Sequence, residues 1–72
     1  MSITPRFKIG TRFIRRKTKR QDVETIIDIY TTTNSKGEIV RIRYVAELDF
    51  MGQAVIDFDV YDSTIALSKI VK

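Results

Sequence analysis

Apolar and polar side chains alternate with a period of two along residues 23–31, 40–48 and 54–60. Successive side chains of a β-strand point to opposite faces, so this period predicts strands rather than helices. The three stretches are rich in Ile, Val, Thr, Tyr and Phe, the residue types that favour strands. We therefore expect three strands that each bury one face.

The segment Asn34-Ser35-Lys36-Gly37 separates the first two stretches and predicts a hairpin turn, because Gly tolerates a positive φ. A loop of two or four residues there pairs residues whose numbers add to 71. This register places the apolar residues of both strands on one face. The expected pairs are Ile29 with Ile42, Ile27 with Tyr44, and Thr25 with Ala46.

The segment Met51-Gly52-Gln53 predicts the next turn. Tyr44 and Phe58 share a face only if this loop has an odd number of residues, so we expect about three or five, with Gly52 at a bulge. Both hairpins then contribute to one core, which also receives Phe13. Its other predicted members are Ile27, Ile29, Ile42, Tyr44, Ile56 and Phe58.

Two shorter strands are expected at the ends of this meander. One lies near residues 10–16, and residues 63–71 read as a short helical turn followed by a last strand. Residues 17–22 are expected to form a loop, residues 1–6 to be disordered, and residues 1–72 to make a single domain. The predicted fold is all-β, either a small five-stranded barrel or a strongly curved antiparallel meander, because a flat sheet would leave one face and two edges bare.

Five short segments carry a resemblance to known proteins: Lys8-Ile9-Gly10-Thr11-Arg12-Phe13, Asn34-Ser35-Lys36-Gly37-Glu38, Arg43-Tyr44-Val45-Ala46, Met51-Gly52-Gln53 and Thr64-Ile65-Ala66. Together they span about residues 8–66 and resemble small uncharacterised proteins of tailed bacteriophages. The order of a glycine-led strand, a basic loop, a meander and a closing segment is similar to that of SH3-like barrels. The resemblance implies an SH3-like barrel of phage origin. Such barrels bind peptides, nucleic acids or ribosomes, so the fold alone selects no ligand.

The residue types present argue against catalysis. The chain has no His for general-base work and no Cys nucleophile or thiolate ligand. Asp57-x-Asp59 is the remaining candidate, since a carboxylate pair on one strand face can bind Mg²⁺ or divide acid and base roles. Cross-strand ion pairing of both carboxylates with Arg41 and Arg43 is the favoured alternative. We therefore predict a protein that is not an enzyme and has no cofactor or metal site.

Positive charge is concentrated near the start of the chain. Residues 1–20 contain eight basic side chains and no acidic one, whereas residues 21–72 contain five basic and nine acidic ones. Such a cluster attracts phosphate groups, and Arg adds bidentate contacts. A solvated loop that protects a sheet edge and a contact for an acidic protein surface are the alternatives. The predicted nucleic-acid-binding residues are Arg15, Arg16, Lys17, Lys19 and Arg20.

The outer face of the predicted sheet also carries apolar side chains. Adjoining residues of this kind mark an interface for another protein or for a second copy of the chain. The alternative is that the tail residues Ile70 and Val71 fold over them. On the same face we expect Arg43 to lie across from Asp28 and near Asp57 or Asp59. The predicted protein interface consists of Ile26, Tyr30, Val45 and Val55.

No stretch of the sequence approaches the roughly 20 apolar residues that a membrane-spanning helix needs. The first residues also lack the apolar segment of a signal peptide. We therefore expect a cytoplasmic protein, located in the host cytoplasm if the protein comes from a phage.

Overall fold

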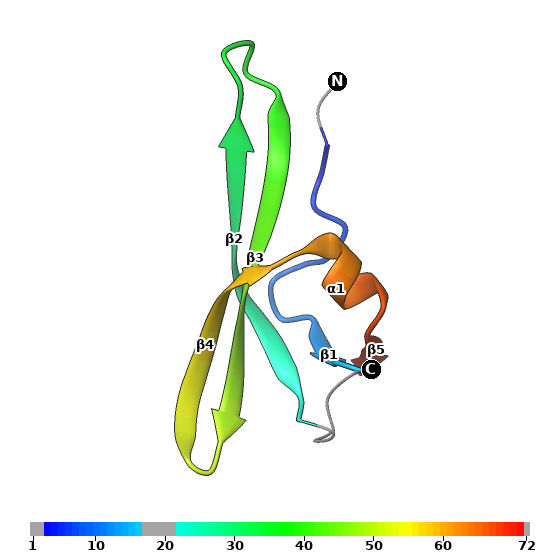
Figure 1. Ribbon diagram of the computed structural model, residues 1–72, viewed down its shortest axis with the longest axis vertical. Helices are drawn as coiled ribbons and strands as arrows, with labels where there is room; N and C mark the ends of the chain where they lie inside the picture. The colour runs from blue at the N-terminus through cyan, green and yellow to red at the C-terminus, as the bar shows by residue number, and fades with distance from the viewer. Residues whose placement is uncertain (1–2, 17–21, 72) are drawn as a thin grey trace.

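The computed structural model describes residues 3–16 and 22–71, which form five strands and one five-residue helix (Figure 1). The elements are β1 (Arg12–Ile14), β2 (Glu24–Thr33), β3 (Ile39–Phe50), β4 (Gln53–Val60), α1 (Asp62–Ala66) and β5 (Lys69–Val71). In this described part of the chain no helix is long enough to cross a bilayer.

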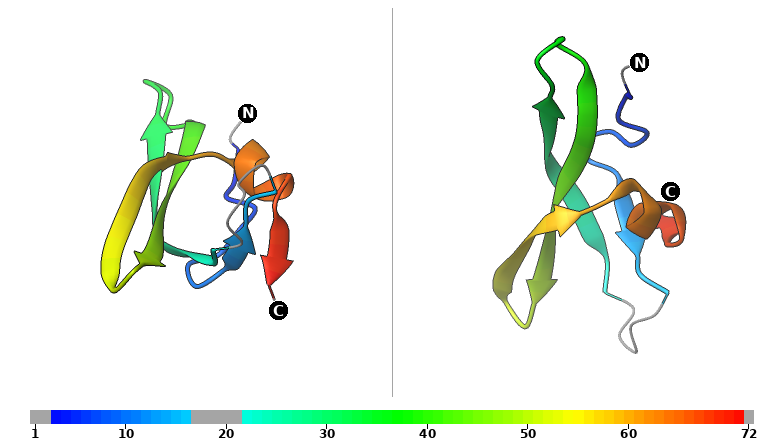
Figure 2. Two further views of the ribbon diagram at one scale, coloured as in Figure 1. Left: turned by 60° about the horizontal axis from the view of Figure 1, so that its bottom comes forward. Right: turned by 45° about the horizontal axis from the view of Figure 1, so that its top comes forward.

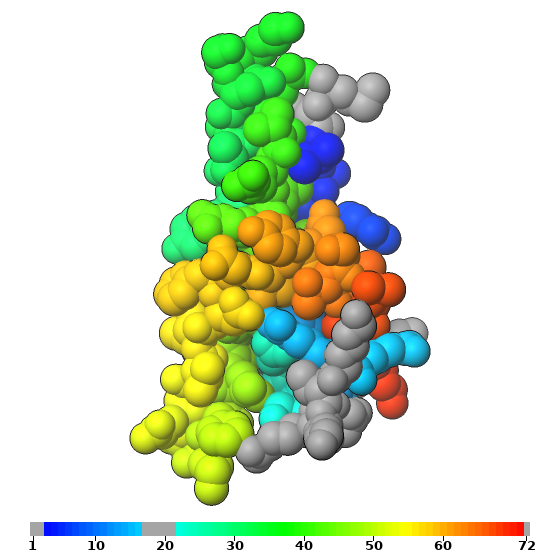
Figure 3. All heavy atoms as spheres, in the orientation of Figure 1, coloured from blue at the N-terminus to red at the C-terminus, as the bar shows by residue number. Residues whose placement is uncertain are grey.

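All five strands belong to one antiparallel sheet of order β4-β3-β2-β1-β5, which confirms the predicted all-β fold with a short helix before the last strand. Figure 2 shows the sheet curling, so that β4 and the β1–β5 pair lie on opposite sides of the interior. The molecule is elongated, 44 × 22 × 19 Å. Its two long hairpins project in opposite directions, as the space-filling view shows (Figure 3).

The β2–β3 hairpin has a register different from the predicted one. Its loop spans 34–38, one residue longer than expected, and Asn34 organises it by accepting hydrogen bonds from the backbone N–H groups of Lys36 and Glu38 at 2.9 and 3.0 Å. Ile29 pairs with Tyr44 rather than with Ile42. A bulge then shifts the register, and the pairs on its two sides are Asp28 with Val45 and Ile26 with Ala46.

This bulge decides which isoleucine of β2 enters the core. The extra residue at Ile27 reverses the alternation of the strand, because each one-residue shift exchanges the two faces. Ile26 is fully buried, whereas Ile27 is 38% exposed. The predicted core position of Ile27 and the predicted outward position of Ile26 are therefore both wrong.

The β3–β4 hairpin closes with a two-residue turn rather than an odd-numbered loop. Met51 and Gly52 have φ angles of 51° and 82°, the pair of positive values that a type I′ turn requires. Phe50 consequently pairs with Gln53, and Val55 rather than Ile56 shares a face with the core residues of β3. Ile56 and Phe58, expected in the core, are 42% and 55% exposed on the opposite face.

The core lies inside the curl of the sheet. Phe13, Ile42 and Tyr44 are buried there as predicted, and Ile29 packs against them while partly buried. The bulge in β2 brings in Ile26, which the simple alternation had placed outside, and the bulge in β4 returns Val60 to the core side. The buried members of the cluster are Phe13, Ile26, Ile42, Tyr44, Ala46, Val60 and Ile65.

Residues 3–7 lie along β3, whereas residues 1–6 were expected to be disordered; residues 1 and 2 lie outside the described residues. The Ile3 N–H donates to the Ile39 carbonyl at 3.1 Å. The phenol oxygen of Tyr44 accepts hydrogen bonds from the N–H groups of Arg6 and Phe7 at 3.0 and 3.4 Å. The same hydroxyl donates to Asp62 Oδ1 at 2.5 Å, which links this segment through β3 to the start of α1.

Candidate functional site

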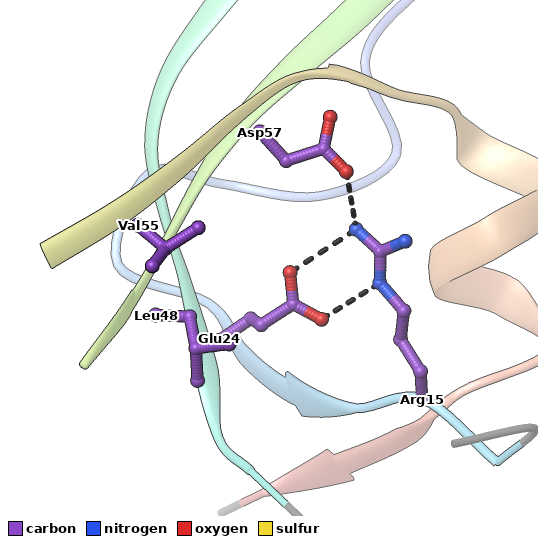
Figure 4. Close-up of a pocket in the computed structure, with 5 residues that line it drawn as sticks. All are labelled: Arg15, Glu24, Leu48, Val55 and Asp57. Carbon is purple, nitrogen blue, oxygen red and sulfur yellow. Dashed lines mark hydrogen bonds and ion pairs between the residues drawn. The ribbon is translucent and has the colours of Figure 1, made fainter. Parts of the chain in front are cut away.

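Arg15, the first residue of the predicted nucleic-acid site, is bound to two carboxylates across the open side of the curled sheet (Figure 4). It follows β1 directly. Its Nε donates to Glu24 Oε2 at 2.7 Å and its Nη2 to Glu24 Oε1 at 3.1 Å, a bidentate contact with β2. Nη2 also donates to Asp57 Oδ2 of β4 at 2.9 Å. One guanidinium therefore links β1 to β4, which the sheet order separates by two strands.

The opposite charges of Arg15 and Asp57 stabilise each other's charged forms. Burial acts against the charge on Arg15, but hydrogen bonds to Asp57 and Glu24 outweigh it and raise the pKa of the guanidinium. The pKa of Asp57 is lowered, chiefly by the Asp59 N–H and then by Arg15, against an opposing effect of burial. Arg15 thus bridges β2 and β4 through three hydrogen bonds to carboxylates, with its side chain 29% exposed.

A surface hollow of about 240 Å³ adjoins the Arg15 cluster, and Leu48 and Val55 form its apolar part. Its other lining residues are Arg15, Glu24 and Asp57, which already bind one another. Among the described residues, no buried polar side-chain atom lacks a partner, and no group of His, Cys, Asp or Glu is arranged to hold a metal. The hollow therefore presents no unpaired polar group that would select a ligand.

The two carboxylates of Asp57-x-Asp59 do not form the shared site that strict alternation suggested. A bulge between the Ala46 and Tyr44 pairings turns them to opposite faces of β4. Asp57 binds Arg15 on the inner side, and Asp59 accepts from Arg43 Nη1 at 3.2 Å on the outer side. The predicted contact of Arg43 with Asp59 is confirmed.

The predicted contact of Arg43 with Asp28 is wrong. Arg43 pairs with Tyr30 across the β2–β3 ladder, because that ladder is shifted by two residues from the predicted register. Asp28 lies opposite Val45 and accepts a hydrogen bond from the Ile29 N–H at 2.8 Å.

The short β1–β5 pair carries basic side chains on its outer face. Phe13 points into the core, so its neighbours Arg12 and Ile14 point outward. Arg12 pairs with Val71 and Ile14 with Lys69, which makes Arg12 and Lys69 diagonal neighbours on this outer face. Both side chains are exposed.

These residues extend the predicted basic segment. Arg16 is exposed just beyond β1, while Lys17, Lys19 and Arg20 lie outside the described residues. The sequence interpretation did not include Lys69, because nothing in a single sequence shows that β5 pairs with β1. Its place on the outer face follows only once that pairing and its register are known.

The outer face of β2, β3 and β4 presents a second surface. Tyr30 is 46% exposed there, as predicted. Val45 also lies on this face, since Tyr44 and Ala46 on either side of it belong to the core, yet it is only 2% exposed. Val55, by contrast, lines the hollow on the inner side. The predicted interface of Ile26, Tyr30, Val45 and Val55 is therefore divided between the two faces.

Comparison with known proteins adds no family to this description. The sequence matches no protein-family model, and neither curated proteins nor solved structures gave a significant match. The resemblance to SH3-like barrels and to small phage proteins therefore stays a prediction.

Proposed function

We propose that this protein is a non-catalytic cytoplasmic binding module that binds DNA or RNA weakly and without strong sequence preference. The observation that carries the proposal is that β1 and β5 bring Arg12 and Lys69 together on one outer face, immediately before the basic segment. Cations that neutralise phosphates release counterions from the nucleic acid, which supplies affinity independent of sequence. The binding surface consists of Arg12, Arg16, Lys17, Lys19, Arg20 and Lys69.

Arg15 has a supporting role in this proposal. Its two carboxylate partners neutralise it, so it contributes little to the attraction of phosphates. Its contacts instead anchor the chain where the basic segment leaves β1. A substitution of Arg15 should therefore change stability more than salt-dependent binding.

Fluorescence anisotropy with labelled single- and double-stranded oligonucleotides tests the proposal. If the protein meets four phosphates of duplex DNA, log K falls with log salt at a slope near about −3.6, or −0.9 for each phosphate. Replacing Arg16, Lys17 and Lys19 together by Glu should abolish binding, and Arg12→Glu with Lys69→Glu should weaken it while leaving the thermal melt unchanged.

Lys36→Glu is the matched control, because Lys36 is an exposed cation at the tip of the β2–β3 hairpin, away from β1 and β5. It changes the net charge of the protein by the same amount as the charge reversal of any one residue of the binding surface. Equal loss of binding in Lys36→Glu and Arg12→Glu would show an effect of overall charge only. No anisotropy change with any oligonucleotide at low salt would reject the proposal.

A protein-interaction module, such as an inhibitor of a host protein or an assembly subunit, is the second candidate. The observation that favours it is the 55% exposure of Phe58 beside Ile56 on the outer face of β4. Aromatic anchors dominate the energetics of protein interfaces. A partner protein bound in this way would be retained after nuclease treatment and lost on Phe58→Ser. Arg12→Glu with Lys69→Glu would leave this partner bound.

A further inference from the structure

The free edge of β4 is an unprotected strand edge. β4 pairs with β3 on one side, and among the described residues no segment pairs with its other side (Figure 1). The backbone groups of such an edge bind a strand of another chain unless charge, proline, short length or a covering segment prevents it. Residues 50–56 contain no charged residue and no proline, and residues 53–56 are all exposed.

The other edges of the sheet are protected. β2 extends past its pairing with β1, and there the carboxylate of Asp28 accepts a hydrogen bond from the Ile29 N–H at 2.8 Å. The part of β3 that β4 does not reach is covered by the N-terminal segment, since the Ile3 N–H donates to the Ile39 carbonyl. β5 has only three residues and begins with Lys69. β4 is therefore the edge to which another strand can be added.

The two-residue turn between β3 and β4 fixes which backbone groups face this edge. Residues that flank such a turn form a hydrogen-bonded pair, and hydrogen-bonded pairs alternate with non-hydrogen-bonded pairs along the ladder. Gln53 and Val55 therefore bond to β3, whereas the N–H and C=O groups of Ala54 and Ile56 point to the free edge. The regular ladder ends at the bulge after Asp57, so Val55 is the centre of this stretch.

We propose that the free edge of β4 binds the same edge of a second copy of the chain, forming an antiparallel two-fold dimer centred on Val55. Val55 then lies opposite its own copy. Ala54 lies opposite Ile56 of the partner subunit, so the backbone groups that point to the edge on both chains meet and form hydrogen bonds. Gln53 lies opposite Asp57 of the partner subunit. The two five-stranded sheets join into one continuous sheet.

The side chains of this stretch are complementary to their own copies. Asp57 is the only charged residue of 53–57, and across the edge it faces the Gln53 amide, a hydrogen-bond donor. Its contact with Arg15 at 2.9 Å lies on the inner side and is kept. The acidic side chains of Glu47 and Asp49 on β3 stay three strand spacings, about 14 Å, from those of the partner subunit, which is beyond the Debye length. No like charges therefore oppose each other, as a symmetric interface requires.

The dimer goes beyond both candidate functions and rests on neither. The basic residues of β1 and β5 and the exposed Phe58 all lie outside residues 53–57. Assembly stops at two copies, because pairing of β4 uses the one unprotected edge and the remaining edges are protected. A dimer that binds no oligonucleotide would reject the proposed nucleic-acid function and leave the dimer standing.

Sedimentation equilibrium and amide hydrogen exchange test the dimer. The wild-type protein should show a monomer–dimer equilibrium, and the amides of Ala54 and Ile56 should exchange more slowly as the protein concentration rises. Val55→Lys and Val55→Glu each set two like charges against each other at the two-fold axis and should raise the dissociation constant about 10-fold or more. An equimolar mixture of the two variants should dimerise again, because the introduced ammonium group then faces the introduced carboxylate.

Thr32→Lys and Thr32→Glu are the matched controls, because Thr32 is exposed on β2 and lies outside the paired edge. They make the same charge changes and should dimerise like the wild type. Ala54→Pro, which removes an N–H that points to the edge and no hydrogen bond to β3, should weaken the dimer. Thermal melts confirm that each variant is folded.

Three results would overturn the proposal. One is a wild-type protein that stays monomeric at all concentrations. The second is a dimer in which the amides of Ala54 and Ile56 exchange at the rate of the monomer. The third is a mixture of Val55→Lys and Val55→Glu that assembles no better than either variant alone.

Discussion

At the scale of single residues, Arg15 and Tyr44 connect parts of the chain that are far apart in sequence. Arg15 joins the end of β1 to Glu24 and to Asp57, 42 residues away. Tyr44 is fully buried, and its hydroxyl joins the N-terminal segment to Asp62. Both act through polar contacts at the margin of a small core, where a lost partner leaves another group unsatisfied.

Arg15→Ala should lower the free energy of unfolding by about 1–3 kcal/mol, because Glu24 would lose its bidentate partner while largely buried. Arg15→Lys should recover only part of this loss, since an ammonium group cannot contact both Glu24 oxygens in the same geometry. Chemical denaturation of both variants measures the difference. Wild-type stability in Arg15→Ala would contradict the proposed link between β1 and β4.

The Tyr44 hydroxyl should make stability depend on alkaline pH. Burial, and then its hydrogen bond to Asp62, raises the pKa of Tyr44 above the ordinary value of 10.0. The folded state thus favours the protonated phenol, so this stabilisation is complete below pH 10 and is lost as pH rises through the folded-state pKa. Tyr44→Phe should cost about 1–2 kcal/mol at neutral pH. Melting curves should show a smaller alkaline loss in this variant than in the wild type.

At the scale of secondary-structure elements, two bulges on either side of Val45 determine which side chains reach the core. Each adds a residue to one strand and exchanges its faces. In β2 the bulge directs Ile26 inward and Ile27 outward, and in β4 it returns Val60 to the core side. Phe58 lies outside for a different reason, because the two-residue turn at Met51 and Gly52 sets the register that places Ile56 and Phe58 on the outer face.

Ile26 and Ile27 provide a matched pair of substitutions for this register. Ile26→Ala should lower the free energy of unfolding by about 2–5 kcal/mol, because it creates a cavity in the core. Ile27→Ala should cost less than about 1 kcal/mol, because Ile27 is 38% exposed. Ile42→Ala should resemble Ile26→Ala, since Ile42 is 5% exposed in the same cluster. The opposite ranking of the two neighbours would contradict the bulge.

At the scale of the whole molecule, basic and acidic side chains are concentrated on different parts of the sheet. Arg12, Arg16 and Lys69 lie on or next to β1 and β5, whereas Glu47 and Asp49 lie on the β3–β4 hairpin at the other side. A polyanion should therefore approach the protein from the β1–β5 side. A chain of 72 residues buries a small core and has a small free energy of unfolding. The free energy that a bound ligand adds is therefore a large fraction of the total.

Duplex DNA at about 100 times its dissociation constant should stabilise the folded state by about 2.7 kcal/mol. The melting temperature should therefore rise with DNA concentration at low salt and return to its starting value at high salt, where the phosphate contacts are screened. The variant with Glu at positions 16, 17 and 19 should melt at the same temperature with and without DNA. A salt-independent rise in the wild type would indicate contacts other than those with phosphates.

The sequence by itself determined the strand class, the hairpin positions and the burial of Phe13, Ile42 and Tyr44, because period-two alternation and turn residues act within a few positions of the chain. It also located the concentration of basic residues. Only the tertiary structure decided the two bulges, the pairing of β1 with β5 and the contact of Arg15 with Asp57. A bulge depends on packing on both sides of a strand, and one inserted residue exchanges every face beyond it. Ile26 and Ile27 were misplaced for this reason, since strict alternation continues through positions where the ladder does not. Phe58 was misplaced because the β3–β4 turn has two residues instead of an odd number.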